Sequence, residues 1–168
     1  MRIISLLLLL LLVGCGYHSP GNSDNWVGDE ARLLYVQLFE NRTVEPYLDN
    51  YITDAVIAEL SRSRLLELTE DSDLAEVRLV GEVKDFDSEA RSYSSSDEIT
   101  AYTATMTVAV RLLRKNSSEI VWQQTMQRTQ EYLAENNKNL QLEDQKLAAR
   151  QVSLRLAEDI HASMLNNF

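Results

Sequence analysis

Residues 102–112 place the strongest constraint on the fold of this chain. Along this segment, apolar side chains occupy every second position: Tyr102, Ala104, Met106, Val108, Val110 and Leu112. Successive side chains of a β-strand point to opposite faces, so this period of two predicts a long strand with one buried face. Other elements of the chain must cover that face.

Four further segments have the alternation or composition of strands. Residues 77–83 alternate in the same way, and residues 119–129 return after a predicted turn at 116–118 as a hairpin partner. Two shorter segments complete the set: 34–39, which is apolar on both faces, and 64–70. A polar loop is predicted over 89–100, between the two longest strands.

Two segments have the apolar spacing of three and four residues that amphipathic helices require. The first, 46–62, begins with Pro46 in its first turn and has this apolar face: Leu48, Ile52, Ala55, Val56 and Leu60. The second, 141–165, has this stripe: Ala149, Val152, Leu156, Ile160 and Met164, widened by Leu147, Leu154 and Leu165. The order predicts an α+β fold, a two-layer sandwich in which two amphipathic helices cover one face of a mixed, mostly antiparallel sheet.

The other face of this sheet is poor in charge on its two clearest strands. It displays Thr103, Thr105, Thr107, Ala109 and Arg111, then Gln123, Thr125, Gln127 and Thr129. A solvated surface is one interpretation, but such surfaces usually carry Lys and Glu. A polar protein partner could cover threonine and glutamine without desolvating charges. The sequence thus suggests a docking face for a protein partner: Thr103, Thr105, Thr107, Gln123, Thr125 and Gln127.

The first 14 residues have the character of a secretory signal. Arg2 precedes an apolar run, Ile3–Leu12, which is too short to span a bilayer. The run ends at Leu12-Val13-Gly14-Cys15, which resembles the lipobox of bacterial lipoproteins and predicts acylation of Cys15; the alternative is a cleaved secretory protein with an incidental cysteine. Gly16, in place of a retention aspartate, favours the outer membrane. We therefore expect a signal peptide at 1–14, a lipidated linker at 15–30 and one α+β domain at 31–168.

Composition argues against several classes of function. The net charge of −10 disfavours binding of nucleic acid through the overall field of the protein. Cys15 is the only cysteine, so no disulfide is expected. The two histidines, His18 and His161, have no cysteine available to pair with, and no zinc spacing, phosphate loop or nucleophile elbow occurs. We expect a protein that is not an enzyme and that uses no metal or cofactor.

Several stretches resemble, in order, the LptE family of lipopolysaccharide-assembly lipoproteins. These are Cys15-Gly16-Tyr17-His18, "YVQLFENRTVEP" with "ITDAVIAEL", "AEVRLVGEVKDF", "TAYTATMTVAVRLL" and "EIVW". The FENRT-x-EP stretch is the most specific, because a strand, a turn and a helix start coincide there. The resemblance covers nearly the whole chain after the signal peptide.

The resemblance implies a lipid-anchored (palmitate-bearing) protein on the periplasmic side of the Gram-negative outer membrane. Family members plug the β-barrel LptD, help it to assemble, and with it insert lipopolysaccharide into the outer leaflet. Basic residues near the hairpin loop are tied to lipopolysaccharide contact in the family; here that region offers Lys84 and Arg91, and the next candidates are Arg111, Arg114 and Lys115. The alternative from another class is a periplasmic lipoprotein regulator that binds a cell-wall synthase or a secretion channel.

Overall fold

The computed structural model describes residues 32–115 and 119–166. The predicted signal peptide, Cys15, the linker and the turn at 116–118 therefore lie outside the described residues. Within the described part of the chain, no helix is both long and apolar enough to cross a membrane.

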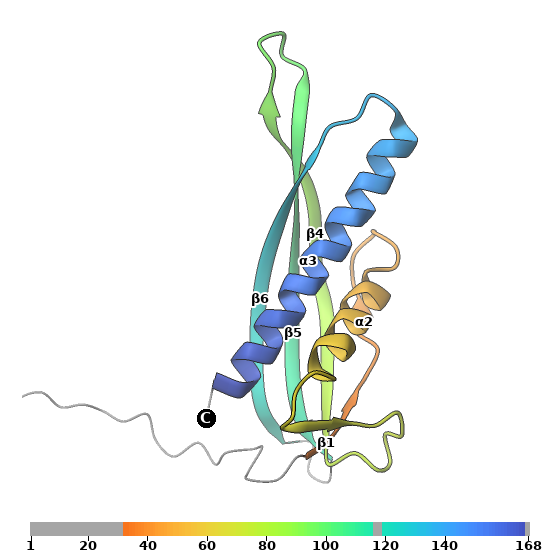
Figure 1. Ribbon diagram of the computed structural model, residues 1–168, viewed down its shortest axis with the longest axis vertical. Coiled ribbons are helices and arrows are strands. Elements are labelled where there is room, and N and C mark those ends of the chain that lie inside the picture. The colour runs from red at the N-terminus through yellow and green to blue at the C-terminus, as the bar shows by residue number, and fades with distance from the viewer. Residues whose placement is uncertain (1–31, 116–118, 167–168) are drawn as a thin grey trace, which may run out of the picture.

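The chain forms one sheet with two helices on one side of it (Figure 1). The strands are β1 (Arg32–Val36), β2 (Glu40–Asn41), β3 (Leu66–Leu68), β4 (Val77–Tyr93), β5 (Ile99–Arg114) and β6 (Ile120–Leu133). The helices are α2 (Leu48–Leu60) and α3 (Lys138–Asn166). The strand order is β3-β1-β4-β5-β6, with β2 also paired to β4. The β1 pairs and the β2–β4 pair are parallel, whereas β4, β5 and β6 are antiparallel, so the predicted α+β fold is confirmed.

The core lies between the sheet and the two helices. The alternating residues of β5 are all buried, from Ala104 to Leu112. Helix α3 crosses β5 and β6 and packs against α2 (Figure 1). Its buried stripe is Val152, Leu156, Ile160 and Met164, each 0% exposed. The apolar face of β5 is therefore covered by the helices, as its alternating pattern predicts.

A tightly packed corner joins β1, β2 and the start of α2. We call it the FENRT corner, residues 39–43 with Thr53 and Gly81. The Phe39 ring is buried against Gly81, where an added Cβ would lie within 2.6 Å of Phe39 Cζ. The backbone N–H of Phe39 donates to Thr53 Oγ1 at 3.0 Å, and that hydroxyl donates to the Asp49 carbonyl at 2.7 Å. The corner therefore anchors α2 to the sheet.

Four details of the sequence prediction are wrong. Helix α2 begins at Leu48, not at Pro46, because Tyr47 adopts a left-handed conformation with φ 67°. The strand predicted over 34–39 ends at Val36, so that Leu38 is exposed while Phe39 is buried. Most of the loop predicted over 89–100 is strand, and only 94–98 form the tip of a hairpin that projects past the helices (Figure 1).

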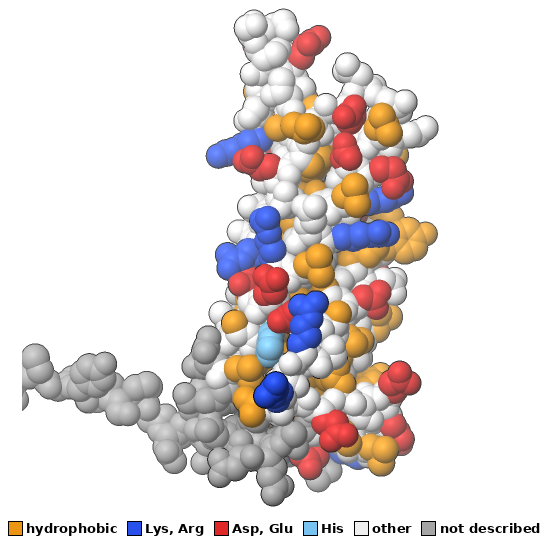
Figure 2. All heavy atoms as spheres, viewed as in Figure 1, with side chains coloured by type: hydrophobic (Ala, Val, Ile, Leu, Met, Phe, Trp, Pro, Cys, Tyr) orange, Lys and Arg blue, Asp and Glu red, His pale blue; other side chains and the backbone are white. Residues whose placement is uncertain are grey.

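The fourth difference concerns α3. Leu147 and Leu154 do not widen the core stripe: with Leu140, they lie on the solvent side of the helix, each more than half exposed. They are seven residues apart, which keeps them on one line opposite the buried stripe. Figure 2 shows this helical face of the molecule, where hydrophobic, basic and acidic side chains are interspersed.

Candidate functional site

The sheet face that carries no helix is the candidate site, and its side chains are aligned by the strand register. Thr107 of β5 lies opposite Gln127 of β6, and Gln127 Nε2 donates to Thr107 Oγ1 at 3.2 Å. The same register pairs Thr105 with Thr129 and Ala109 with Thr125. Thr103 and Gln123 extend the two columns at their ends. All six residues predicted for docking therefore lie on one face; we call these two columns the threonine–glutamine face.

An acidic column on β4 borders this face, and the sequence reasoning missed it. The register places Glu82 beside Ala109, Asp85 beside Thr107 and Asp87 beside Thr105; Glu89 continues the column beside Thr103. A bulge between Val83 and Asp85 shifts the alternation by one residue. Without that bulge, Glu82 and Asp85 would point to opposite faces. The face thus has an uncharged part over β5 and β6 and an acidic boundary on β4.

The five basic residues predicted to contact lipopolysaccharide are not brought together. Arg91 lies near the hairpin tip, whereas Arg114 ends β5, about 40 Å away at the usual rise per residue. Arg114 pairs with Glu119 at 3.5 Å, and Lys115 Nζ donates to the Asp73 carbonyl. Lys84 is exposed within the β4 bulge. They do not form a single phosphate-binding cluster.

Arg111 instead lies near Arg42, a residue that the sequence reasoning assigned only to a turn. Both line a hollow of about 620 Å³ that also includes Gln123 and Thr125. Arg42 contacts Glu40 at 3.1 Å and Glu82 at 2.9 Å. The hydrogen bond to Glu40, with the charges of both carboxylates, raises the pKa of Arg42 above its ordinary value.

Arg111 makes no ion pair within residues 32–115 and 119–166, so its charge is the less compensated of the two. Its exposed side chain could meet an anionic group at the end of the threonine–glutamine face. Of the five predicted basic residues, Arg111 lies on that face and makes no ion pair within the described residues; Glu82 lines the same hollow but pairs with Arg42.

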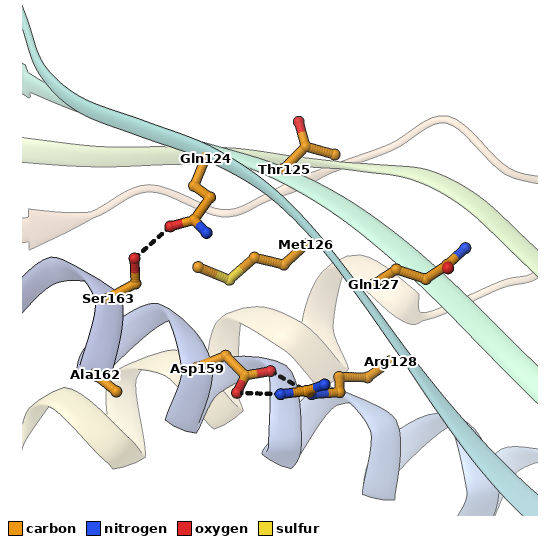
Figure 3. A pocket seen from close by; sticks show the side chains of 8 residues that line it. All are labelled: Gln124, Thr125, Met126, Gln127, Arg128, Asp159, Ala162 and Ser163. Carbon is orange, nitrogen blue, oxygen red and sulfur yellow. Dashed lines mark hydrogen bonds and ion pairs between the residues drawn. The ribbon is translucent and has the colours of Figure 1, made fainter.

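A second hollow lies between β6 and α3 (Figure 3). It has a volume of about 470 Å³. Arg128 bridges it to α3, with Nε and Nη2 donating to Asp159 at 2.6 and 2.8 Å. Figure 3 shows Gln124, Met126 and Arg128 directed toward α3, while Thr125 and Gln127 point away from it. Opposite sides of β6 therefore serve the helix and the threonine–glutamine face.

Metal-ligating side chains are not clustered in the described part of the chain. In the ranges 32–115 and 119–166, no three His, Cys, Asp or Glu side chains are grouped so as to hold a metal ion. His161 is partly buried and lies 3.1 Å from Glu59 Oε1, a contact that links α3 to α2. Its position supports a structural role between the helices.

The fold and this face define a class of protein: a two-layer α+β protein with a broad polar face on the uncovered side of its sheet. The LptE family, described as lipopolysaccharide-assembly, matches residues 31–164, and the chain belongs to that family. It is a family of non-catalytic lipoproteins, consistent with a location in the cell envelope. The resemblance inferred from the sequence is therefore confirmed.

Solved structures agree with the fold. The rare lipoprotein B of Shewanella oneidensis has a TM-score of 0.56 at 12% identity, with 80% of this chain and 95% of that chain covered. Lipoprotein B of Nitrosomonas europaea has a TM-score of 0.53 at 13% identity, with coverages of 77% and 79%. A minor lipoprotein of Acinetobacter baumannii has a TM-score of 0.50 at 14% identity, with coverages of 81% and 92%. A comparison with curated proteins finds no match.

Proposed function

We propose that this protein is an outer-membrane lipoprotein, anchored through acylated Cys15, that plugs an LptD-type β-barrel. In this role it helps the barrel to assemble and promotes insertion of lipopolysaccharide into the outer leaflet. Membership of the LptE family supports a role in lipopolysaccharide assembly. The barrel, the anchor and the lipid contact are the parts that we propose.

The observation that carries the proposal is the threonine–glutamine face. Two adjacent columns of uncharged polar side chains run along the uncovered side of β5 and β6. The wall of a large barrel is polar on its inner side. Such a wall can cover uncharged polar side chains without the penalty of burying unpaired charges. The helical face is less suitable, because α3 presents both acidic and basic side chains to solvent (Figure 2).

We further propose that Arg111 contacts a phosphate of lipopolysaccharide. Its guanidinium suits phosphate recognition, and among the predicted basic residues it alone lies beside the threonine–glutamine face without a competing ion pair. Lys84, Arg91, Arg114 and Lys115 stay weaker candidates, because they are dispersed along the sheet or engaged elsewhere.

Site-specific crosslinking tests the docking proposal. A photoreactive residue at Thr105, in the full lipidated chain in cells, should crosslink to the outer-membrane barrel, identified by mass spectrometry. The matched control is the same residue at Ala58, which is exposed on α2. Crosslinking at Ala58 but not at Thr105 would show that the helical face, and not the threonine–glutamine face, contacts the barrel. Capture of a cell-wall synthase or a secretion channel at Thr105 would favour the regulator instead.

Two cellular measurements test the anchor and the role. Cys15→Ala should leave the chain uncleaved and without acyl mass; ordinary processing of this variant would contradict the lipobox assignment. Depletion of the protein should lower surface lipopolysaccharide and mature barrel together. Unchanged levels of both would contradict the proposed function.

A further inference from the structure

The sheet ends at β6, and this edge is long and weakly protected. Among the described strands, β6 pairs only with β5. Its 14 residues include no proline, glycine or lysine. Natural proteins usually protect a free edge with proline or charged side chains, lysine above all, or keep it short, as at the opposite edge, where β3 has three residues. The charged residues of β6 are Arg128 and Glu131. The edge of β6 therefore offers an open row of backbone donors and acceptors.

One hydrogen bond shows which backbone groups face the open side. Arg155 Nη1, from α3, donates to the Thr129 carbonyl at 3.3 Å. The Ala134 N–H donates to the Thr100 carbonyl, so in this register the even-numbered residues of β6 bond to β5. The Thr129 carbonyl therefore points to the free edge, where the Arg155 side chain reaches it. Backbone groups of alternate residues point to the same side of a strand, which directs the N–H groups of Thr125 and Gln127 there as well.

Space for an additional strand lies beside these groups. The hollow of about 470 Å³ between β6 and α3 is lined by five consecutive β6 residues, 124–128, and by Asp159, Ala162 and Ser163 (Figure 3). A second hollow of about 390 Å³ shares Gln127 and Arg128 with it and extends to Arg155. The two hollows adjoin at Gln127 and Arg128, and we call them together the edge groove.

The charges along the groove indicate which side chains an incoming segment should carry. Arg128 and Asp159 compensate each other through their two hydrogen bonds. Arg155 is exposed, and within the described residues its guanidinium donates to a neutral carbonyl and forms no ion pair. The groove therefore has one uncompensated positive charge, which suits a carboxylate.

We propose that an extended segment of the partner protein, about six residues long with a carboxylate facing α3, adds to β6 as a further strand. Arg155 then leaves the Thr129 carbonyl and pairs with that carboxylate. This inference rests on the proposed function, because the segment belongs to the barrel protein. Strands of a closed barrel already have both edges paired, so the segment must come from a loop or a terminal region outside the barrel wall.

Crosslinking separates this inference from the proposed function. A photoreactive residue at Ala162 should capture a peptide of the barrel protein that lies outside its wall. If Thr105 crosslinks to the barrel but Ala162 captures only a wall strand or nothing, the added strand is excluded while the proposed function stands. Capture of a second copy of this chain at Ala162 would also overturn the inference. If neither position captures the barrel protein, both proposals are wrong.

Two substitutions at one position test the backbone pairing. Gln127→Pro and Gln127→Ala both remove the amide side chain, but only proline removes the N–H group. We expect the proline variant to retain about one tenth or less of the barrel protein that the alanine variant retains. Equal retention would overturn the inference.

Hydrogen exchange keeps the test decisive if the proline variant does not fold. In the wild-type complex, the amides of Thr125 and Gln127 should exchange at least about tenfold more slowly than in the free protein, because they donate to the added strand. Unchanged exchange at these two amides would overturn the inference.

Discussion

The FENRT corner and the threonine–glutamine face differ in how their residues are used. At the corner, nearly every polar group has a partner inside the protein: Asn41 Oδ1 accepts from the Thr43 N–H at 3.0 Å, and Asn41 Nδ2 donates to the Glu45 carbonyl at 2.7 Å. On the face, among the described residues, one side-chain hydrogen bond joins the two columns, from Gln127 to Thr107. The polar groups of the corner are used within the fold, whereas most side chains of the face have no hydrogen-bond partner among the described residues.

This difference shows that the most specific motif need not be the site of function. The FENRT stretch gave the clearest family resemblance, and the structure explains its residues through packing and hydrogen bonding. The face consists of common residues that any half-buried strand could carry. Substitutions at the corner should therefore alter stability, and those on the face should alter association.

The largest effect on stability is expected from Gly81→Ala. The new Cβ would overlap the Phe39 ring, which is only 2% exposed, so the packed side chains around it would have to shift. Overpacking of this kind should lower the free energy of unfolding by about 3 kcal/mol. Urea denaturation of the mature domain measures it.

A double-mutant cycle provides the control. Phe39→Leu shortens the side chain that occupies the space, so Gly81→Ala should be less destabilising in that background. If the effect of Gly81→Ala is the same in both backgrounds, the Phe39 contact is not its cause.

A smaller effect is expected from Thr53→Val. Valine has a similar volume but cannot accept the hydrogen bond from the Phe39 N–H, which is then buried without a partner. The loss should be about 2 kcal/mol, measured by thermal or urea denaturation. Thr129→Val, at an exposed position, is the control and should change stability by less than about 0.5 kcal/mol. Equal effects at the two positions would argue against a structural role for the Thr53 hydroxyl.

Asn41→Ala should have a still smaller effect. It removes the hydrogen bonds to Thr43 and Glu45, but the site is only partly buried, so water can replace some of them. We expect a loss of about 1 kcal/mol. Asn50→Ala, at an exposed position of α2, is the matched control. A larger loss of stability for Asn50→Ala than for Asn41→Ala would show that the hydrogen bonds of Asn41 contribute little to the stability of the FENRT corner.

Periodic patterns predicted most of the fold, because burial of one face imposes them directly. The alternation over 102–112 and the stripe on α3 were sufficient for the two layers. The start of α2 was misplaced because Tyr47 adopts a left-handed conformation that its residue type does not indicate. Leu147 and Leu154 were assigned to the core because a leucine on a helix does not by itself show which face it occupies, and both are exposed here.

The candidate site was predicted less completely. The aligned threonine and glutamine columns follow from alternation and a hairpin, so their residues could be named from the sequence. The acidic column could not, because one bulge near Lys84 shifts the alternation of β4. Arg42 was missed because its proximity to Arg111 depends on the parallel pairing of β2 with β4. Contacts between distant segments depend on such pairings, which local patterns do not specify.

The smallest effect on stability is expected from Thr125→Glu. This variant also tests most directly whether the threonine–glutamine face, unlike the FENRT corner, serves association. Thr125 is exposed and lies opposite Ala109, so the folded domain has room for the larger side chain, and its stability should change by less than about 0.5 kcal/mol. In the complex, the new carboxylate would be desolvated without a partner, and the co-purified barrel should fall by about tenfold or more. Ala58→Glu adds the same charge on α2 and should leave co-purification unchanged. Equal recovery of the barrel with both variants would mean that the threonine–glutamine face is solvated and that the partner binds elsewhere.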